Sequence, residues 1–593
     1  MPTFPNLVVE RIRDHLAFLY GRETATLYLE KLLQVLERFV QRKPDLPRAD
    51  LGPGERLTEA DAILITYGDQ LTAPGKTPLS VLAEFLEAHL KGVVSGVHIL
   101  PFFPYTSDDG FSVIDYTAVD PALGSWDDVG RIGRSFRLMF DAVINHISAH
   151  SDWFQAFLKD DPTYADYFTV VEPGTPTEWV SRVTRPRALP LLTPVETPAG
   201  EKLVWTTFST DQIDLNFANP EVLLDIIEVL LLYVEKGAEI IRLDAIAYLW
   251  KEIGTNCIHL PQTHQVVQLF RDVLDAVAPH VLLITETNVP HEENVSYFGD
   301  GTNEAQLVYQ FSLAPLVLNA FHTGDAGHLL HWAASLEAPS ETTTFFNFTA
   351  SHDGVGVRPV EGILDADEFQ QLVDKAQVHG GFVSFKTNPD GTQSPYELNI
   401  SYFDALSDPA RVEQEGLEMQ TRRFLAAQAI MLSLAGVPGI YVHSLLGSRS
   451  WREGVEKTGR YRTINREKLE WHDLAAALAD PTSLRHRVFY QYVHLLRVRS
   501  SQRAFHPNGA QRILFGDRAL FTLLRTSPDG REHLLCVHNV SDEEQDFRVD
   551  LNELGVPHSS AVHDLVFPTR YPIGEDGRLG LTVKPYQVLW LKA

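Results

Sequence analysis

Four short apolar runs of the sequence each end in polar residues that can do chemistry. One run ends at Arg242-Leu243-Asp244, a second at Glu286, a third across residues 141–146 and a fourth at His352-Asp353. Side chains alternate along a strand, so Arg242 and Asp244 lie on the same side, about 7 Å apart. A carboxylate beside a fixed positive charge stays ionised, which suits a nucleophile. A buried ion pair that only holds a strand end in place would look the same.

Three carboxylates stand out among these residues, namely Asp244, Glu286 and Asp353. No His/Cys cluster at metal-ligand spacing accompanies them, and residues 291–294 do not complete an HExxH motif, so we expect no metal and no cofactor. Carboxylates without a metal indicate glycosyl transfer, in which one attacks the sugar and another protonates the leaving oxygen, about 5–5.5 Å apart in a retaining mechanism. Neighbouring strand ends, at ~4.8 Å spacing, supply that separation for Asp244 and Glu286.

The elements that position these residues are short strands alternating with helices. The strands are expected at residues 62–66, 96–100, 138–144, 240–244, 281–286, 307–311, 344–348 and 439–442. Eight such units predict a (β/α)₈ barrel, an α/β fold in which residues at the C-terminal strand ends face the site. A doubly wound open sheet is the alternative, although no glycine-rich turn follows the first strand to suggest dinucleotide binding.

Further segments surround the barrel, which we expect over residues 56–480. Residues 1–55 read as a helical extension, because apolar residues recur at helical spacing between 29 and 40. Two connections are much longer than usual, and they predict an inserted subdomain B at about 147–210 and a subdomain B′ at about 354–418. Residues 481–593 predict a linking helix and a C-terminal antiparallel β domain.

Composition excludes several classes of function. The 593 residues carry a net charge of −28, which opposes binding to nucleic acid or anionic membranes. Cys257 and Cys536 lie far apart without CxxC spacing, so no disulfide framework is expected. No signal peptide and no run of about 18 apolar residues is seen, and a cytoplasmic location is expected.

The strand ends, taken together, resemble the α-amylase superfamily (glycoside hydrolase family 13), whose sequence regions match residues 141–146, 242–245, 286 and 352–353, with a further region at 212–216. Within it the chain is most similar to the sucrose phosphorylase subfamily. The similar stretches include residues 96–103 (GVHILPFF), 124–129 (GSWDDV), 244–254 (DAIAYLWKEIG), 402–406 (YFDAL) and 464–466 (INR). The similarity is dense over about 60–500, looser beyond, and does not explain residues 1–50.

The resemblance implies a role for each matched residue. Asp244 would be the nucleophile, Glu286 the general acid and then base, and Asp353 would hold the distorted sugar. Arg242 would keep Asp244 ionised. The resemblance further implies substrate-binding roles for His146 and His352, for the pair Asp108 and Arg466 at the far edge of the glucose, for Phe111 and Phe208 as walls, and for Gln212 and Tyr248. For Phe111 an ordinary core aromatic is an equal alternative.

On the acceptor side the resemblance implies phosphate recognition by Arg185 and Arg187, since arginine forks suit phosphate; an exposed basic turn is the alternative. A mobile loop around Tyr396 and Glu397 would alternate between acceptor and phosphate. The match departs from sucrose phosphorylases at two places: Asn288 stands where they have histidine, and residues 394–397 read SPYE instead of DLYQ. Both places touch the leaving group, so the acceptor is expected to differ.

The run 285–291 (TETNVPH), with the helical extension and the chain length, is similar to glucosylglycerate phosphorylases. The resemblance therefore implies a two-step exchange of a glucosylglycerate and inorganic phosphate for α-glucose 1-phosphate and the free acceptor. Sucrose, sucrose 6′-phosphate or glucosylglycerol as substrate, a hydrolase or transglucosidase of the same superfamily, and a non-catalytic member remain alternatives. The partners expected are these small molecules alone, bound by a monomer or homodimer; the sequence does not decide between the acceptors.

Overall fold

Eight parallel strands form a closed barrel at the centre of the computed structural model, which describes residues 4–46, 56–172, 174–175, 180, 182–186, 189–388 and 392–593. Around the barrel the strands follow the order β1-β17-β13-β12-β11-β10-β4-β3. They are β1 (Ile63–Thr66), β3 (Gly96–Ile99), β4 (Arg137–Ala142), β10 (Ala238–Leu243), β11 (Leu282–Thr285), β12 (Leu307–Tyr309), β13 (Thr344–Asn347) and β17 (Val437–Tyr441). Every predicted strand is present, so the (β/α)₈ prediction is confirmed and the open-sheet alternative is wrong.

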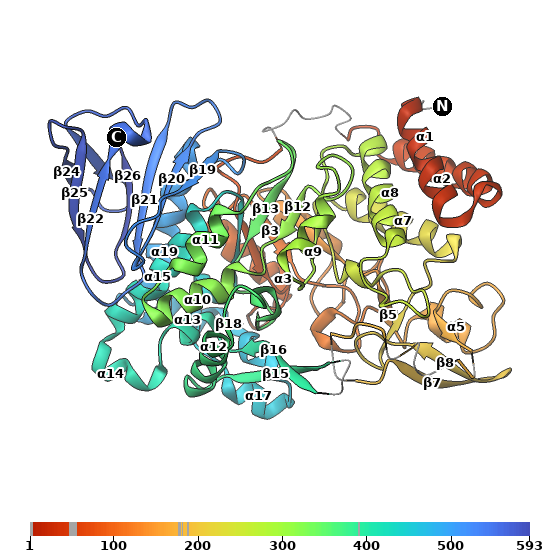
Figure 1. Cartoon of the computed structure of the whole chain (residues 1–593). Coiled ribbons are helices and arrows are strands. Elements are labelled where there is room, and N and C mark those ends of the chain that lie inside the picture. The colour runs from red at the N-terminus through yellow and green to blue at the C-terminus, as the bar shows by residue number, and fades with distance from the viewer. Residues whose placement is uncertain are drawn as a thin grey trace.

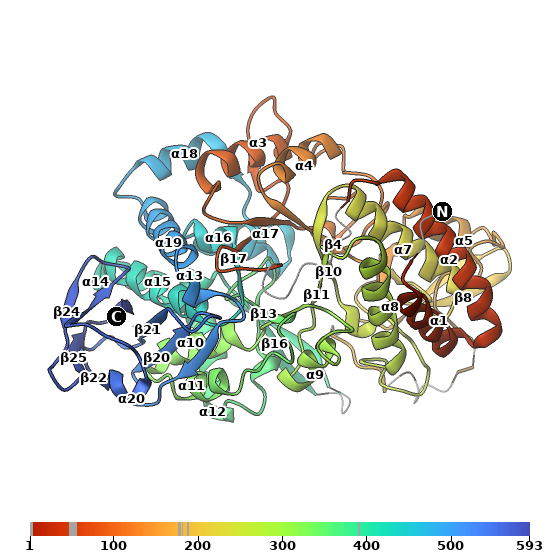
Figure 2. The ribbon, with the colours of Figure 1, turned by 90° about the horizontal axis from the view of Figure 1, so that it is seen from above.

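Helices cover the outside of the barrel, as Figure 2 shows from above. They include α3 (Pro78–Phe85), α4 (Trp126–Gly133), α7 (Pro220–Glu235), α8 (Pro261–Val277), α10 (Leu313–Thr323), α15 (Leu417–Ser433) and α19 (Leu484–Ser500). The start of α7 shows why a helix begins where it does: the Asn219 side chain accepts a hydrogen bond from the backbone N–H of Glu221, and Pro220 occupies the first turn. The helix then buries an apolar face from Val222 to Val234 against the strands.

Two insertions follow the C-terminal ends of β4 and β13 and lie at the lower side of the barrel in Figure 1. The first contains the antiparallel pair β5 (His146–Ser148) and β9 (Gln212–Asp214), helix α5 (Asp152–Phe157) and the sheet of β6 (Val170–Val171), β8 (Gly200–Trp205) and β7 (Leu192–Thr197). The second contains β14 (Val355–Gly356), α12 (Ala366–Val378), β15 (Phe382–Thr387) and β16 (Gln393–Asn399), with β16 as the middle strand. The segment expected as a mobile loop around Glu397 is therefore a paired strand.

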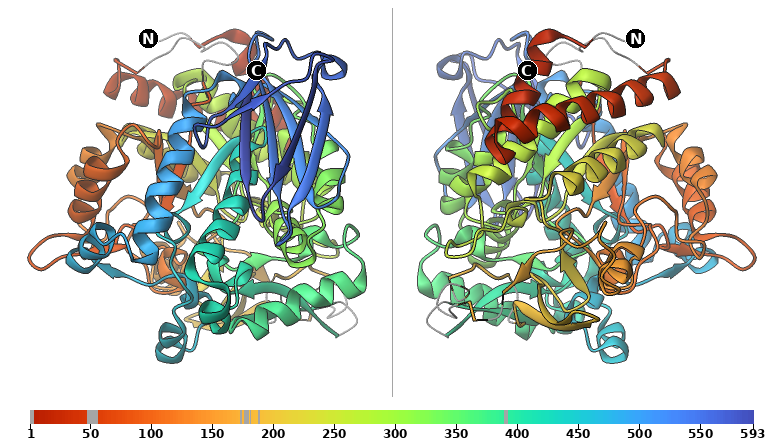
Figure 3. Two further views of the ribbon diagram at one scale, coloured as in Figure 1. Left: turned by 90° about the vertical axis from the view of Figure 1, so that its left-hand side faces the viewer. Right: turned by 90° about the vertical axis from the view of Figure 1, so that its right-hand side faces the viewer.

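The predicted N-terminal helices are α1 (Asn6–Tyr20) and α2 (Arg22–Arg42), and they lie against α7 and α8 (Figure 3). Arg11 forms an ion pair with Asp272 of α8 at 2.6 Å, and the hydroxyl of Tyr20 donates to the carbonyl of Phe217 at 2.9 Å. The extension thus packs on the barrel helices through its buried apolar face and through these polar contacts.

The C-terminal part is an antiparallel sheet with strand order β19-β20-β21-β26-β23-β24, accompanied by the pair β22–β25. Its strands are β19 (Ala510–Ile513), β20 (Leu520–Thr526), β21 (His533–Asn539), β22 (Gln545–Asp550), β23 (Ala561–Asp564), β24 (Arg570–Pro572), β25 (Arg578–Val583) and β26 (Val588–Lys592). The predicted β structure is present, while the domain limits given above stay a prediction.

Arg499, at the end of α19, connects this region to the barrel through hydrogen bonds. Its guanidinium is buried and donates to five backbone carbonyls, those of Glu59, Asp61, Leu432, Gly436 and Phe505. Burial lowers the pKa of this guanidinium to about 10. Glu59 and Asp61 precede β1, Gly436 precedes β17, Leu432 lies in the last turn of α15, and Phe505 precedes the C-terminal sheet. One side chain therefore links the segments that lead into β1 and β17, two neighbouring strands of the barrel.

Candidate active site

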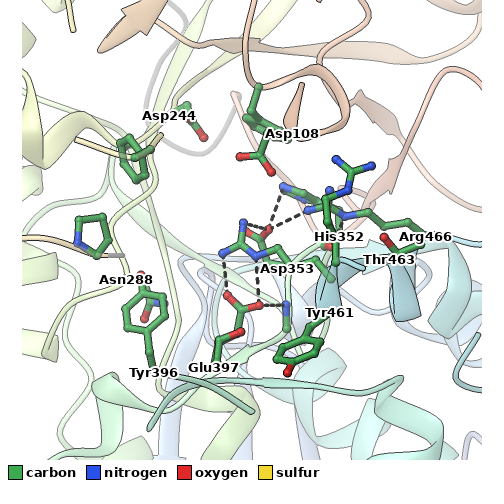
Figure 4. Close-up of a pocket in the computed structure, with 18 of the residues that line it drawn as sticks. Asp108, Asp244, Asn288, His352, Asp353, Tyr396, Glu397, Tyr461, Thr463 and Arg466 are labelled. Atoms are coloured by element: carbon green, nitrogen blue, oxygen red, sulfur yellow. Dashed lines mark hydrogen bonds and ion pairs between the residues drawn. The ribbon is translucent and has the colours of Figure 1, made fainter. Parts of the chain in front are cut away.

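The polar strand ends converge on one cavity of about 340 Å³ at the C-terminal face of the barrel. The register pairs Leu243 of β10 with Thr285 of β11, so Asp244 and Glu286, each one residue further on, lie side by side. Asp353 follows β13, and all three carboxylates line the cavity. Figure 4 shows Asp244 and Asp108 at the top of the view and Tyr396, Glu397 and Tyr461 at the bottom. The convergence expected from the sequence is present.

Arg242 holds the carboxylates at the bottom of the cavity. One of its terminal nitrogens contacts Asp141 and also lies 2.7 Å from Asp244, and the other lies 3.7 Å from Glu286. Asp141 in turn is 2.6 Å from Nε2 of His98. Burial opposes ionisation of Asp141, but Arg242 and His98 outweigh it and lower its pKa to about 2. Asp141 is therefore a permanent anion that fixes Arg242.

Burial shifts the pKa values of Asp244 and Glu286, the two cavity-side carboxylates that share Arg242. Burial raises the pKa of Glu286 to about 7, with Arg242 opposing and Asp244 reinforcing the shift. Burial also raises the pKa of Asp244, although Arg242 opposes it. The sequence predicted that Arg242 keeps Asp244 ionised. The charge of Arg242 does lower the pKa of Asp244, but burial raises this pKa by more. Because Arg242 is closer to Asp244 than to Glu286, its charge favours ionised Asp244 and a protonated Glu286.

Asp353 has a different environment. Burial opposes its ionisation, but Arg462, His352 and Arg466 outweigh burial and hold its pKa well below the usual range. Its Oδ1 lies 2.6 Å from Arg462 and 3.3 Å from Arg466. Asp353 is therefore a fixed anion beside two carboxylates of raised pKa. These pKa values suit a site in which Asp353 only accepts hydrogen bonds from a ligand. Asp244 and Glu286 are then the groups that form a covalent bond to the ligand or transfer a proton to it.

Aromatic and imidazole rings form the walls of the cavity. Phe111 stacks on His352 with ring centroids 4.8 Å apart, and Phe208 lies 5.2 Å from His146 and 5.6 Å from Tyr248. Phe111 is buried and also lines the cavity, and its contact with a substrate stays a prediction. Burial lowers the pKa of His352 to about 3, which keeps that ring neutral. Flat apolar walls with neutral polar edges suit a sugar ring.

Gln212 and His146 are fixed by one shared acceptor. The side-chain nitrogen of Gln212 and Nε2 of His146 each lie 2.9 Å from the carbonyl of Phe111. Both residues line the cavity, as expected. Behind them Lys251 contacts Asp214 at 2.8 Å and donates to Asn145 at 2.9 Å. Sequence reasoning missed Lys251, because a lysine inside a family-like stretch carries no spacing signal of its own.

The sequence placed Asp108 and Arg466 together at the far edge of the glucose, and both residues line the cavity. Arg466 forms its ion pairs with Asp109, at 2.5 Å, and with Asp353, and it donates to the carbonyl of His352 at 2.8 Å. Asp108 lines the cavity next to this group. Asp108 and Asp109 both have positive φ, 54° and 52°, a conformation that is uncommon for residues other than glycine.

Asn288, Tyr396 and Glu397 line the remaining side of the cavity, as predicted. Arg185 does not line it and donates to the carbonyl of Leu189 at 2.9 Å, whereas its neighbour Pro186 does line it. Arg187 lies outside the described residues.

Three arginines of a later segment are at the cavity instead: Arg460, Arg462 and Arg466. Only Arg466 was predicted. The arginine-rich run 459–466 was the available signal for Arg460 and Arg462.

Within the described ranges, no group of three or more His, Cys, Asp or Glu side chains is arranged to hold a metal ion. In the same part of the chain, none of the helices has the length and apolarity needed to cross a membrane.

The fold and the cavity define a (β/α)₈-barrel protein with a carboxylate site at the C-terminal face. A family model described as "Alpha amylase, catalytic domain" matches residues 89–353. A glucosylglycerate phosphorylase of Spirochaeta thermophila is 51% identical over 98% of both chains, and one of Allomeiothermus silvanus is 54% identical over 90% of this chain and 93% of the relative. The crystal structure of sucrose 6F-phosphate phosphorylase from Thermoanaerobacter thermosaccharolyticum superposes with a TM-score of 0.71 at 25% identity, covering 88% of this chain and 98% of that one. The chain belongs to the α-amylase family.

Proposed function

We propose that the chain is a retaining glycoside phosphorylase that converts 2-O-α-glucosyl-D-glycerate and inorganic phosphate to α-D-glucose 1-phosphate and D-glycerate. The geometric observation that carries the reaction type is the shared Arg242, which holds Asp244 and Glu286 side by side with both pKa values raised. The acceptor is supported by the near full-length similarity to two proteins named glucosylglycerate phosphorylase.

In the first step a carboxylate oxygen of Asp244 attacks the anomeric carbon, and the bond from that carbon to the glycerate oxygen breaks. Glu286, protonated near neutral pH, gives its proton to the leaving oxygen. In the second step a phosphate oxygen attacks the anomeric carbon, the bond to Asp244 breaks, and Glu286 takes the proton from the incoming hydrogen phosphate. Two inversions return the α configuration.

Other cavity residues hold the glucose and exclude water. Asp353, kept ionised, accepts hydrogen bonds from two sugar hydroxyls, an interaction that strengthens as the ring distorts. His146, Gln212 and His352 bind further hydroxyls. The rings of Phe111 and Phe208 cover the apolar edges of the sugar, and Asp108 with Arg466 closes the far end.

The acceptor-side residues support a leaving group other than fructose. Asn288 and Glu397 line the cavity at the two places where the sequence departs from the sucrose phosphorylase pattern. A site built around one set of hydrogen bonds rejects a molecule that lacks them by roughly 10⁴–10⁵-fold. Glycerate carries a carboxylate, so a cation on this side favours it over glycerol or fructose.

The test is a panel of α-glucosides incubated with phosphate: glucosylglycerate, sucrose, sucrose 6′-phosphate and glucosylglycerol. Formation of glucose 1-phosphate is followed, and glucosylglycerate is expected to have the highest kcat/KM. Asp244→Asn, which keeps the side-chain size, is expected to lower kcat by a factor on the order of 10⁴ or more, because the nucleophile is lost. Turnover of sucrose without turnover of glucosylglycerate would sink the proposal. Release of free glucose at a rate independent of phosphate would identify a hydrolase instead.

A further inference from the structure

Arg462, in the 3₁₀ turn Tyr461–Asn465, lines the cavity and forms a bidentate ion pair with the carboxylate of Glu397. Its Nε and one terminal nitrogen donate to the two oxygens of Glu397 at 3.1 and 2.6 Å, and its other terminal nitrogen lies 2.6 Å from Asp353. A guanidinium grips planar carboxylates and phosphates in this same bidentate way. The contact with Glu397 therefore shows which kind of group this arginine is oriented to accept.

Among the described residues, the other arginines near the cavity are less suited to bind a ligand anion. Arg466 is 4% exposed, and all three of its nitrogens contact Asp109, Asp353 and the carbonyl of His352. Arg460 lies at the rim, 49% exposed, where solvent screens its charge. Arg242 is 3% exposed and shared between three carboxylates. All three nitrogens of Arg462 are also in contact, two with Glu397 and one with Asp353, but its side chain is 27% exposed, so a ligand in the cavity can reach it.

Glu397 sits where a ligand anion would compete for Arg462. Its side chain is 2% exposed, and its Oε1 also accepts a hydrogen bond from the backbone N–H of Gly354 at 2.9 Å. The ion pair of Arg462 and Glu397 is next to Asp353, so it lies beside the part of the cavity proposed to bind the sugar. A negative ligand arriving here meets attraction from Arg462 and repulsion from Glu397. The two residues therefore act on anion affinity with opposite sign.

We propose that Arg462 is the acceptor-side anion site, which binds an oxyanion in competition with the carboxylate of Glu397. This inference rests on the proposed function, because both exchange partners of that reaction, phosphate and glycerate, carry an oxyanion on the acceptor side. The same arginine serves both, since one leaves before the other enters. Glu397 is a positioning residue that orients the guanidinium and lowers its affinity for anions, so that the product acid dissociates.

The experiment measures KM for phosphate in phosphorolysis of glucosylglycerate and KM for D-glycerate in the reverse reaction, using the full chain. Arg462→Gln is expected to raise both KM values more than about tenfold, because a charged hydrogen-bond donor is lost, and Arg462→Lys is expected to recover part of the loss. Glu397→Gln, which keeps an acceptor for Gly354, is expected to lower both KM values about two- to threefold by removing one negative charge. Arg452→Gln, at an exposed position that does not line the cavity, is the matched control for net charge and is expected to change KM less than about threefold.

KM is expected to change in opposite directions in Arg462→Gln and Glu397→Gln. If the ion pair were purely structural, loss of either partner would lower thermal stability and would change KM in the same direction in both variants or not at all. A rise of only one KM supports the site for that anion alone. Unchanged KM values for both anions in Arg462→Gln and Arg462→Lys would overturn the proposal. If the unmodified chain does not act on glucosylglycerate, the proposed function fails separately. The anion site is then measured with α-glucosyl fluoride as donor, a reaction that uses phosphate and no glycerate.

Discussion

At the scale of single residues, Glu286 combines burial with a long contact to the guanidinium of Arg242. Burial moves its pKa to about 7, and the 3.7 Å contact is too long to reverse that shift. The backbone N–H of Ala245 donates to its Oε2 at 3.1 Å and holds the carboxyl group toward Asp244. A group of this pKa can give a proton in one step and take it back in the next at neutral pH.

The pH dependence of turnover follows from this pKa. Glu286 must be protonated to assist departure of glycerate, so kcat for phosphorolysis is expected to fall about tenfold per pH unit above about pH 7. The fall comes with rising pH, because a carboxyl group loses its proton above its pKa. Initial rates between pH 5 and 9, at saturating phosphate, measure it.

α-Glucosyl fluoride supplies the control for this prediction, because fluoride leaves without protonation. Cleavage of its glucosyl bond is expected to lose the alkaline decline. The same decline with both donors would contradict the role of Glu286 as the acid.

At the scale of elements, the glycine of β17 sets how closely the barrel strands pack. A Cβ added at Gly439 would lie 2.4 Å from two ring atoms of Phe346 in β13. Gly439→Ala is therefore expected to lower the free energy of unfolding by about 1–3 kcal/mol, because the ring or the strand must shift. Gly516→Ala, at an exposed position with no atom within 4 Å, is the control and is expected to be close to neutral. Urea unfolding midpoints of the two variants give the comparison, and equal midpoints would contradict it.

The elements also show what can be read from a sequence. The eight barrel strands were predicted to within two residues at each end, because short apolar runs between helices have few other structures to adopt. Glu286 and Asp353 could be predicted for the same reason, since a strand end fixes its side of the barrel. Strand β16 was expected as a loop, because its partners β14 and β15 are set by long-range pairing that its own composition, including Pro395, does not signal. Arg462 was missed, because it lies in a 3₁₀ turn, which has no strand register from which to place a side chain.

At the scale of the whole molecule, Arg499 links the segments that lead into β1 and β17 to the C-terminal region. Arg499→Met, of similar length, leaves five backbone carbonyls without this donor and is expected to lower the free energy of unfolding by about 3–5 kcal/mol. Arg512→Met, at an exposed position in β19, is the matched control. Thermal denaturation of both variants measures the difference. A variant at 499 as stable as the control would show that the five bonds contribute nothing to stability.

The pairing of β1 with β17 has a consequence for biosynthesis. Ile63 finds its partner Gly439 only after the whole barrel has been translated, which takes on the order of tens of seconds at 5–20 residues per second. Until then β1, whose four residues are all buried in the finished molecule, has an uncovered apolar edge on the ribosome. Whatever shields this edge during translation is therefore expected to change the yield of active protein in cells, at constant equilibrium stability.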